Sequence, residues 1–278
     1  MPPRVVAVIT ARMGSERLPG KVLLPLAGKP VVAHIVERLG RVRGIDAVWL
    51  GTSSSPNNAP LIALARSLGI EVYAGSEEDV VERHVVIAER SRADHLVRAS
   101  ADCPLFDIPL ASRMIAHHVG ARADFTYLPA ILSVGILIEV ISAGAMRRVH
   151  EVYRGEHITL PIKERAEAFR IEPLDVAEAL EGPLYRPEYR LTLDEPADYE
   201  VLKAIYGALY REGEPPDLRR VMAFLDAHPA IARLNAHVHQ KSGNLYAQEL
   251  DARVLEACRR RADSPGTPAA RPRAERRS

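Results

Sequence analysis

The fold is decided by the apolar run Val5-Val-Ala-Val-Ile-Thr10 and the basic stretch that follows it, Ala11-Arg-Met-Gly-Ser-Glu-Arg-Leu-Pro-Gly-Lys21. A short continuous apolar run that ends in turn residues predicts a strand buried on both faces of a parallel sheet. Ligands of such sheets bind beyond the carboxyl ends of the strands, where the loops begin. We therefore expect residues 11–21 to contribute to a binding site.

The composition of this stretch predicts a loop that wraps a polyphosphate. It holds three cations, a hydroxyl and two glycines: Arg12, Arg17, Lys21, Ser15, Gly14 and Gly20. The glycines let backbone N–H groups approach an anion, and the cations make charge-assisted hydrogen bonds to it. An ordinary solvated basic loop is the alternative, but the position after a buried strand favours a binding loop.

Strand and helix alternate over the first hundred residues. Apolar periodicity predicts strands over 5–10, 47–50, 70–73 and 95–99. Helices are expected from Pro30 to Gly40, over 59–68, and up to residue 90, the last opened by a capping box of Ser76 and Asp79. This alternation is typical of βαβ units in a mostly parallel sheet.

The remainder of the chain is less regular. We expect strands over 125–128, 135–141, 169–172 and 189–193, a helix over 156–168, and further helices from Pro196 to Leu209 and from Leu218 to Leu225. Past Arg261 the composition turns to Pro, Ala, Arg and Ser, which predicts a disordered basic tail over 262–278. The sequence thus predicts one α/β domain over 1–261, with a helical extension over about 212–261.

Composition excludes several classes of function. The net charge of +1 gives no overall field that would attract nucleic acid or an anionic membrane, and the aromatic content of 5% argues against a base-stacking protein. Cys103 and Cys258 form neither a disulfide framework nor a metal motif. With no signal peptide and no apolar stretch of transmembrane length, we expect a cytoplasmic protein that binds neither nucleic acid nor membrane.

Two aspartates stand out. Asp102-Cys-Pro104 and Asp194-Glu-Pro196 each follow an expected strand. Two carboxylates at neighbouring strand ends suit Mg²⁺, which takes one or two carboxylates and completes its shell with phosphate oxygens and water. For each aspartate alone, a helix cap or a turn is the alternative. We expect neither aspartate to be used in a local ion pair, and both to share one metal ion.

Two motifs near the start of the chain are Arg12-x-x-Ser15-x-Arg17-Leu-Pro-Gly-Lys21 and Leu26-x-Gly28-Lys29-Pro30. With the two aspartates, they closely resemble the cytidylyltransferases that make CMP-activated acidic sugars. The resemblance is nearest to the spore-coat polysaccharide (SpsF-type) branch, with CMP-Kdo and CMP-sialate synthetases as related groups. It extends from about Val5 to Tyr210.

The resemblance implies a Rossmann-like, GT-A-like nucleotidyltransferase fold with a small acceptor and dimerisation subregion over about 125–172. It implies a Mg²⁺-dependent, homodimeric enzyme of polysaccharide biosynthesis that transfers CMP from CTP to an anionic acceptor and releases pyrophosphate. The implied catalytic residues are Arg12, Lys21, Asp102 and Asp194, of which Asp102 and Asp194 hold the metal. The implied nucleotide-binding residues are Ala11, Arg12, Met13, Gly14, Ser15, Arg17, Lys21, Thr52, Ser53, Arg98 and Asp102. The implied acceptor residues are Glu139, Glu156 and His157.

The chain departs from the family pattern on the acceptor side. Val134 and Leu137 stand where relatives commonly carry acidic residues, and Ala101 replaces a usual glycine, which is sterically mild. Either the acceptor differs or acceptor chemistry has been lost, so a non-catalytic nucleotide-binding or assembly protein is one alternative. A nucleotide-sugar glycosyltransferase is the other, although the Asp-x-Asp motif typical of that class does not occur in the sequence.

Overall fold

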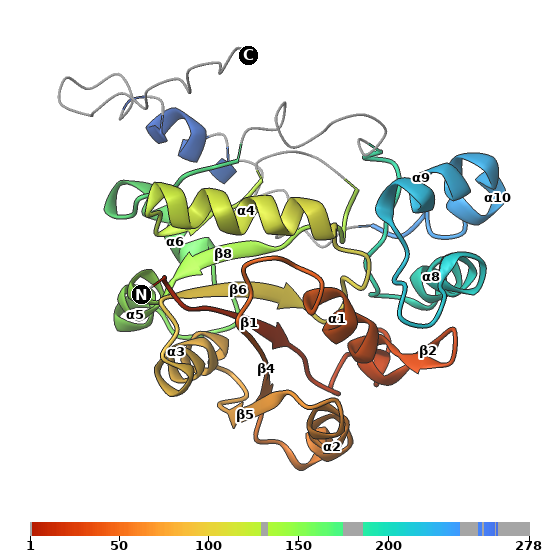
Figure 1. Cartoon of the computed structure of the whole chain (residues 1–278), viewed down its shortest axis with the longest axis horizontal. Helices are drawn as coiled ribbons and strands as arrows, with labels where there is room; N and C mark the ends of the chain where they lie inside the picture. The colour runs from red at the N-terminus through yellow and green to blue at the C-terminus, as the bar shows by residue number, and fades with distance from the viewer. Residues whose placement is uncertain are drawn as a thin grey trace, which may run out of the picture.

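The computed structural model describes residues 2–128, 133–174, 186–239, 250–251, 253–258 and 260, and is shown in Figure 1. A six-stranded sheet in the order β5-β4-β1-β6-β8-β7 forms its centre. Its parallel strands are β1 (Val5–Thr10), β4 (Ala47–Ser53), β5 (Glu71–Gly75) and β6 (His95–Ser100). β8 (Glu139–Ser142) runs antiparallel to β6 and to the edge strand β7 (Phe125–Thr126). The expected mostly parallel α/β fold is confirmed.

The register of the parallel strands brings their carboxyl ends to one edge. Thr10, the last residue of β1, pairs with Gly51 of β4 on one side and with Ser100 of β6 on the other. The loops that follow β1 and β6 therefore begin next to each other. Ligand sites of open parallel sheets form at this edge.

Alternate side chains of β1 pack into two different hydrophobic clusters, one on each face of the sheet. Val5, Ala7 and Ile9 belong to one buried cluster, whereas Val6 and Val8 belong to another. Because successive side chains of a strand point to opposite faces, this strand is covered on both sides, as its continuous apolar sequence predicts.

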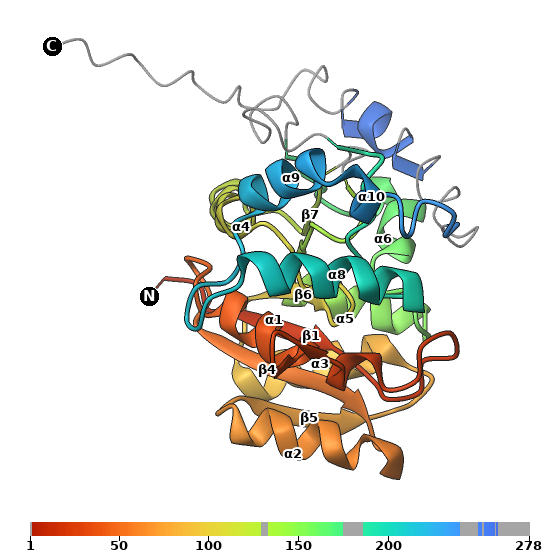
Figure 2. The same ribbon diagram turned by 90° about the vertical axis from the view of Figure 1, so that its right-hand side faces the viewer.

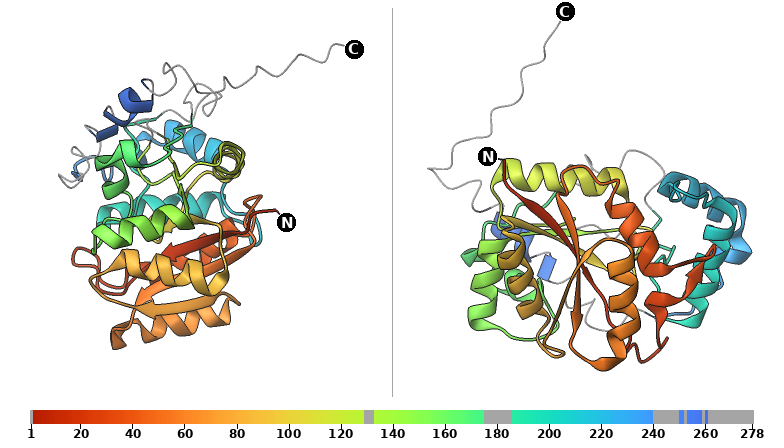
Figure 3. Two further views of the ribbon diagram at one scale, coloured as in Figure 1. Left: turned by 90° about the vertical axis from the view of Figure 1, so that its left-hand side faces the viewer. Right: turned by 60° about the horizontal axis from the view of Figure 1, so that its bottom comes forward.

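Helices cover both faces of the sheet (Figure 3). The first cluster takes apolar side chains from α1 (Val31–Leu39), α2 (Ala59–Ser67), α4 (Ile108–Ala121), α8 (Pro196–Leu209), α9 (Leu218–Ala227) and α10 (Pro229–Ala232). The second takes them from α3 (Val80–Ser91), α5 (Ala143–Val152) and α6 (Leu160–Glu164). Figure 2 shows α8 lying beside the small hairpin of β2 (Pro25–Leu26) and β3 (Lys29–Pro30), where the Tyr199 hydroxyl donates a 2.7 Å hydrogen bond to the Pro25 carbonyl.

The elements expected before residue 100 and after residue 196 are confirmed within a few residues, but two helices between them, α4 and α5, were not foreseen. Asp107 accepts a hydrogen bond from the Leu110 N–H and begins α4, with Pro109 in its first turn. The cap of α3 was also assigned to the wrong residue. Asp79, not Ser76, caps that helix by accepting from the Glu82 N–H, and the Ser76 hydroxyl instead accepts from the Asp79 N–H.

The expectations for the middle of the chain were less accurate. The helix expected over 156–168 is wrong: α6 begins only at Leu160, because Pro161 fits the first turn of a helix but not its interior, and a 3₁₀ turn over Ala166–Ala168 follows. The segments 169–172 and 189–193 form isolated bridges rather than strands, and 135–141 becomes regular only from Glu139. The expected tail, 262–278, lies outside the described residues. Within the described part of the chain, no helix has both the length and the apolar character to cross a bilayer.

Candidate active site

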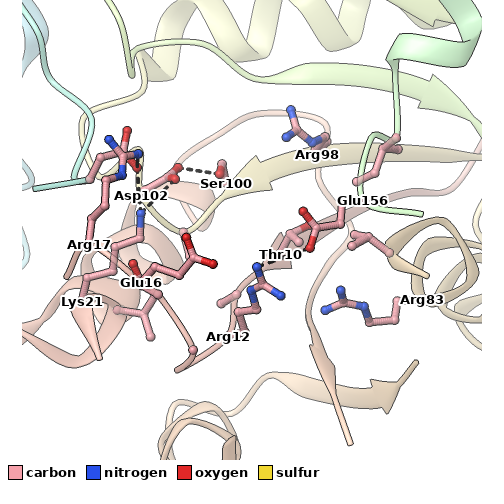
Figure 4. A pocket seen from close by; sticks show the side chains of 18 residues that line it. Thr10, Arg12, Glu16, Arg17, Lys21, Arg83, Arg98, Ser100, Asp102 and Glu156 are labelled. Carbon is pink, nitrogen blue, oxygen red and sulfur yellow. Dashed lines mark hydrogen bonds and ion pairs between the residues drawn. The ribbon is translucent and has the colours of Figure 1, made fainter. Parts of the chain in front are cut away.

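A cavity of about 400 Å³ opens at the carboxyl edge of the sheet (Figure 4). Its walls come from the loop after β1, from the end of β6 and the loop beyond it, from α3, and from two segments far along the chain. The charged residues that line it are Arg12, Glu16, Arg17, Lys21, Arg83, Arg98, Asp102, Glu156 and Asp194. The structure thus brings together residues that lie far apart in the sequence.

Backbone hydrogen bonds hold the shape of the loop after β1. The N–H groups of Ser15 and Gly20 both donate to the Met13 carbonyl, at 2.9 and 3.1 Å. Gly20 has a φ of 69°, a left-handed conformation that glycine adopts without the cost a Cβ imposes. A 3₁₀ turn follows directly and begins with Lys21, whose side chain is thereby set against the loop after β6. From outside the loop, Asn58 accepts a 2.8 Å hydrogen bond from the Met13 N–H.

Lys21 lies at the centre of the site. Its ammonium group lies 3.2 Å from an Asp102 carboxylate oxygen, 3.0 Å from an Asp194 carboxylate oxygen, and 2.6 Å from the Leu193 carbonyl. Burial opposes ionisation of Asp102, but the Lys21 ammonium and the Ser100 hydroxyl outweigh it, so the pKa of Asp102 lies below its usual value. Two carboxylates thus converge on one position that carries positive charge.

The expectation that Asp194 would have no local ion pair is wrong. Arg190, four residues earlier, places a guanidinium nitrogen 2.7 Å from Asp194 and also pairs with the buried Asp198 at 2.8 Å. Arg17 adds a third cation at 3.3 Å from Asp194. Asp198 in turn accepts from the backbone N–H groups of Asp194 and Glu195, and the second of these contacts belongs to the capping box in which Glu195 caps α8. Arg190 and Asp198 are supports of the site that the sequence analysis did not identify.

The pair Asp102 and Asp194 has the chemistry required to hold a divalent cation. Both oxygens already face a common cation, the Lys21 ammonium, so an ion in their midst would find two carboxylate ligands. No third His, Cys, Asp or Glu completes a metal cluster among the described residues. Two carboxylates suit Mg²⁺, which usually keeps water and substrate phosphates as its remaining ligands.

A second cavity of about 510 Å³ adjoins the first and shares Arg17, Arg98, Ser100, Asp102 and Asp194 with it. Its remaining walls are partly apolar and partly charged, made by Cys103, Tyr127, Leu128, Val134, Leu137, Ile138, Glu139, Lys163, Thr192 and Asp251. Val134 and Leu137, the two apolar residues that depart from the family pattern, therefore both line this second cavity.

The residues expected at the acceptor separate in the structure. Glu139 lines the second cavity, where it accepts from Arg98 at 2.7 Å and from the Thr159 hydroxyl at 3.2 Å. Glu156 lines the first cavity and lies 3.3 Å from Arg12. His157 is exposed and lines neither cavity.

Three of the expected nucleotide-binding residues, Met13, Thr52 and Ser53, line neither cavity. Thr52 and Ser53 are fully buried at the end of β4. Ser53 accepts hydrogen bonds from the Asn58 amide through its carbonyl and hydroxyl oxygens, at 3.1 and 2.7 Å. Because Asn58 holds the backbone of Met13, Ser53 supports the loop after β1 from beneath.

Arg83 is a cation of the first cavity that the sequence analysis missed. It is 2% exposed, and its Nε finds no hydrogen-bond partner among the described residues. Burial and the neighbouring Arg12 lower the pKa of Arg83. A signal was present in the sequence, since Arg83 shares a helix face with Val80 and Ile87, and a charged residue on an apolar face calls for a function.

Comparisons with known proteins identify the family. The sequence profile described as "Cytidylyltransferase" matches residues 6–214. The chain is 32% identical to the spore coat polysaccharide biosynthesis protein SpsF of Bacillus subtilis, over 82% of this chain and 96% of that protein. A 110-residue segment is 36% identical to 3-deoxy-manno-octulosonate cytidylyltransferase of Anaeromyxobacter sp., covering 37% of this chain and 42% of that enzyme. The structure of a cytidylyltransferase from Leptospira borgpetersenii superposes with a TM-score of 0.75 at 25% identity, covering 83% of this chain and 97% of that chain. The chain belongs to the cytidylyltransferase family.

Proposed function

We propose that this protein transfers CMP from CTP to a small anionic acceptor, in the first place an acidic sugar, and releases pyrophosphate. The observation that carries the proposal is the convergence of Lys21, Asp102 and Asp194 beneath a basic loop, at the carboxyl edge of the sheet. The names of its relatives, a spore coat polysaccharide protein and a cytidylyltransferase for a sugar acid, support this class of acceptor.

The charges of the first cavity support a metal-dependent reaction. Five cations and four carboxylates line it, so most of the positive charge is already compensated before a triphosphate binds. A magnesium ion held by Asp102 and Asp194 would neutralise these carboxylates and polarise the α-phosphate. The Lys21 ammonium would then be available to the triphosphate.

The residues of the chain would act chiefly by position and charge. The N–H groups and cations of the loop after β1 hold the phosphates, and Arg12 and Lys21 stabilise the negative charge that builds up on the leaving pyrophosphate. The acceptor lies in the second cavity, which adjoins Asp102 and Asp194, so that its oxygen faces the α-phosphorus. In-line attack breaks the bond between the α-phosphorus and the bridging oxygen, and pyrophosphate departs.

Nucleotide titration with a pyrophosphate readout tests this proposal. We expect CTP with Mg²⁺ to raise the melting temperature more than ATP or GTP, and sugar acids to release pyrophosphate in its presence. Equal stabilisation by a purine triphosphate would place the protein outside the proposed function. The subregion 125–172 is also proposed to form a homodimer contact, which light scattering of the purified protein tests.

A further inference from the structure

One ion pair closes the far wall of the second cavity. The ammonium group of Lys163, from α6, lies 2.6 Å from a carboxylate oxygen of Asp251, and their side chains are 9% and 22% exposed. The same ammonium lies 4.3 Å from the centre of the Tyr127 ring. A largely buried cation in a cavity that adjoins the proposed reaction centre is thus covered by a carboxylate of the chain itself.

Asp251 comes from a part of the chain that the family profile does not include. The profile ends at residue 214, whereas Tyr127, Glu139 and Lys163 lie within it. Leu250 and Val254, on either side of Asp251, are fully buried, so this segment is held against the domain by apolar contacts. The segment therefore adds one carboxylate to a cavity that the family domain otherwise builds.

The position is unfavourable for an ionised Asp251. Burial raises its pKa, the Lys163 ammonium and the Tyr127 hydroxyl lower it, and the carboxylate of Glu139 raises it again, so that the pKa of Asp251 lies above its usual value. Glu139 itself is compensated by Arg98, at 2.7 Å. Lys163 is therefore the cation of this wall, and Asp251 meets both desolvation and a second carboxylate nearby. An incoming carboxylate that also makes contacts of its own in the cavity can replace it.

We propose that Lys163 is the anchor for the carboxylate of the acceptor, and that Asp251 occupies this anchor until the acceptor arrives. Asp251 is then an internal competitor that sets the affinity for acidic acceptors. In this exchange Leu250 and Val254 keep their buried positions, and the Asp251 side chain is the group that gives way. This inference rests on the proposed function, whose acceptor class it specifies.

Titration of sugar acids by calorimetry tests it on the full-length protein. The probes are 3-deoxy-manno-octulosonate and glucuronate, with CTP titrated separately. We expect D251N to bind at least one of the acids at least threefold more tightly than the wild type, and K163M to bind the same acid at least tenfold more weakly. K163R keeps the charge and should retain most of the affinity. E256Q removes an exposed carboxylate from the same segment, 2.7 Å from Arg260 and outside the second cavity, and should leave every value unchanged.

Three outcomes would overturn the inference. One is unchanged acid affinity in K163M with a wild-type melting curve, another is unchanged or weaker affinity in D251N, and the third is no binding of either acid by wild type and D251N. None of these depends on CTP, whose affinity should be the same in all four variants. Failure of the wild type to bind CTP would instead refute the proposed function.

Discussion

At the scale of single residues, Lys21 has two proposed tasks that it cannot perform at the same time. Without nucleotide it neutralises Asp102 and Asp194, and with nucleotide it is proposed to contact the phosphates. In the proposed function, a metal ion and the Lys21 ammonium would compete for the same two carboxylates. CTP, by drawing Lys21 toward its phosphates, would therefore favour metal binding, and by linkage the metal would favour CTP.

Lys21→Met separates these two tasks. Loss of one charge-assisted contact typically costs about 1.5–3 kcal/mol, so CTP affinity should fall by at least tenfold. Affinity for Mg²⁺ without nucleotide should rise, because the competing cation is gone. Calorimetric titration of each ligand measures both effects. Lys29→Met, which removes a lysine outside both cavities, is the matched control. Unchanged CTP affinity in Lys21→Met would contradict the assignment of the phosphate loop.

Asp102→Asn and Asp194→Asn test the shared metal site. Each should abolish most turnover, and the double variant should be little worse than either single one, as expected of groups that act together. Asp194→Asn should also lower the melting temperature, because it removes one of the charged partners of the buried Arg190. Pyrophosphate release and thermal unfolding without metal measure the two effects. Near-normal magnesium-dependent turnover in either variant would refute the shared site.

The residues of this site that lie in one continuous motif could be predicted from the sequence. Arg12, Ser15, Arg17 and Lys21 stand within ten positions, and their composition already indicates anion binding. Asn58 has no such local signal, because its role comes from a contact with the loop after β1. Arg83 does stand out as a charge on an apolar helix face, but that pattern does not show which cavity the charge lines. The pairing of Lys163 with Asp251 joins residues 88 positions apart, and no local pattern records it.

At the scale of secondary structure, the sequence predicts an element correctly where both its apolar pattern and the residues that end it are present. The strands β1, β4, β5 and β6 follow from apolar runs between turn residues. The predicted start of the helix around Ile162 was wrong. The apolar periodicity there does not include the constraint that Pro161 imposes, since proline fits only the first turn of a helix. β7 and β8 were shorter than expected, since pairing with a neighbour, rather than composition, determines where a strand ends.

Two buried histidines, His118 and His84, make the stability of the fold sensitive to acid. His118 of α4 lies 3.0 Å from both Thr126 of β7 and His95 of β6, and burial lowers its pKa to about 3. Burial likewise lowers the pKa of His84 of α3 to about 4. Both groups titrate near pH 6.5 once the chain unfolds. Between pH 6.5 and 4 the unfolded state thus binds more protons, and stability falls as pH falls.

Each of these histidines contributes a slope of up to about 1.4 kcal/mol per pH unit in that window. Burial raises the pKa values of Asp107 and Asp251, so at the acidic end of this pH window these two groups make stability rise as pH falls. Denaturant unfolding from pH 7.5 to 4.5 measures the balance. We expect a flat profile above pH 6.5, a decline below it, and a shallower decline in His118→Gln. His157→Gln, at an exposed site, should keep the wild-type slope. A profile for His118→Gln as steep as that of the wild type would contradict this account.

At the scale of the whole molecule, the site depends on chain segments that meet only once the sheet is complete. The carboxyl ends of β1 and β6 align in register, and the segment of Asp194 runs beside the loop of Asp102, where the Leu193 N–H donates to the Asp102 carbonyl at 2.7 Å. The second carboxylate of the proposed metal site is thus positioned by a backbone contact between residues 91 positions apart. The centre is therefore complete only when both segments lie in place beside each other.

Two truncations distinguish the parts of the carboxyl-terminal region. Removal of residues 262–278 should leave the melting temperature and CTP affinity unchanged, because that stretch has no apolar periodicity with which to offset the entropy of ordering it. Removal of residues 240–278 should lower the melting temperature, since it takes Leu250 and Val254 from buried positions, each worth about 1.5–3 kcal/mol. CTP affinity should change little in either case, because Asp251 and its neighbours lie outside the first cavity. Thermal unfolding with and without CTP measures both quantities. A large loss of stability in the shorter truncation would show that the basic tail belongs to the folded domain.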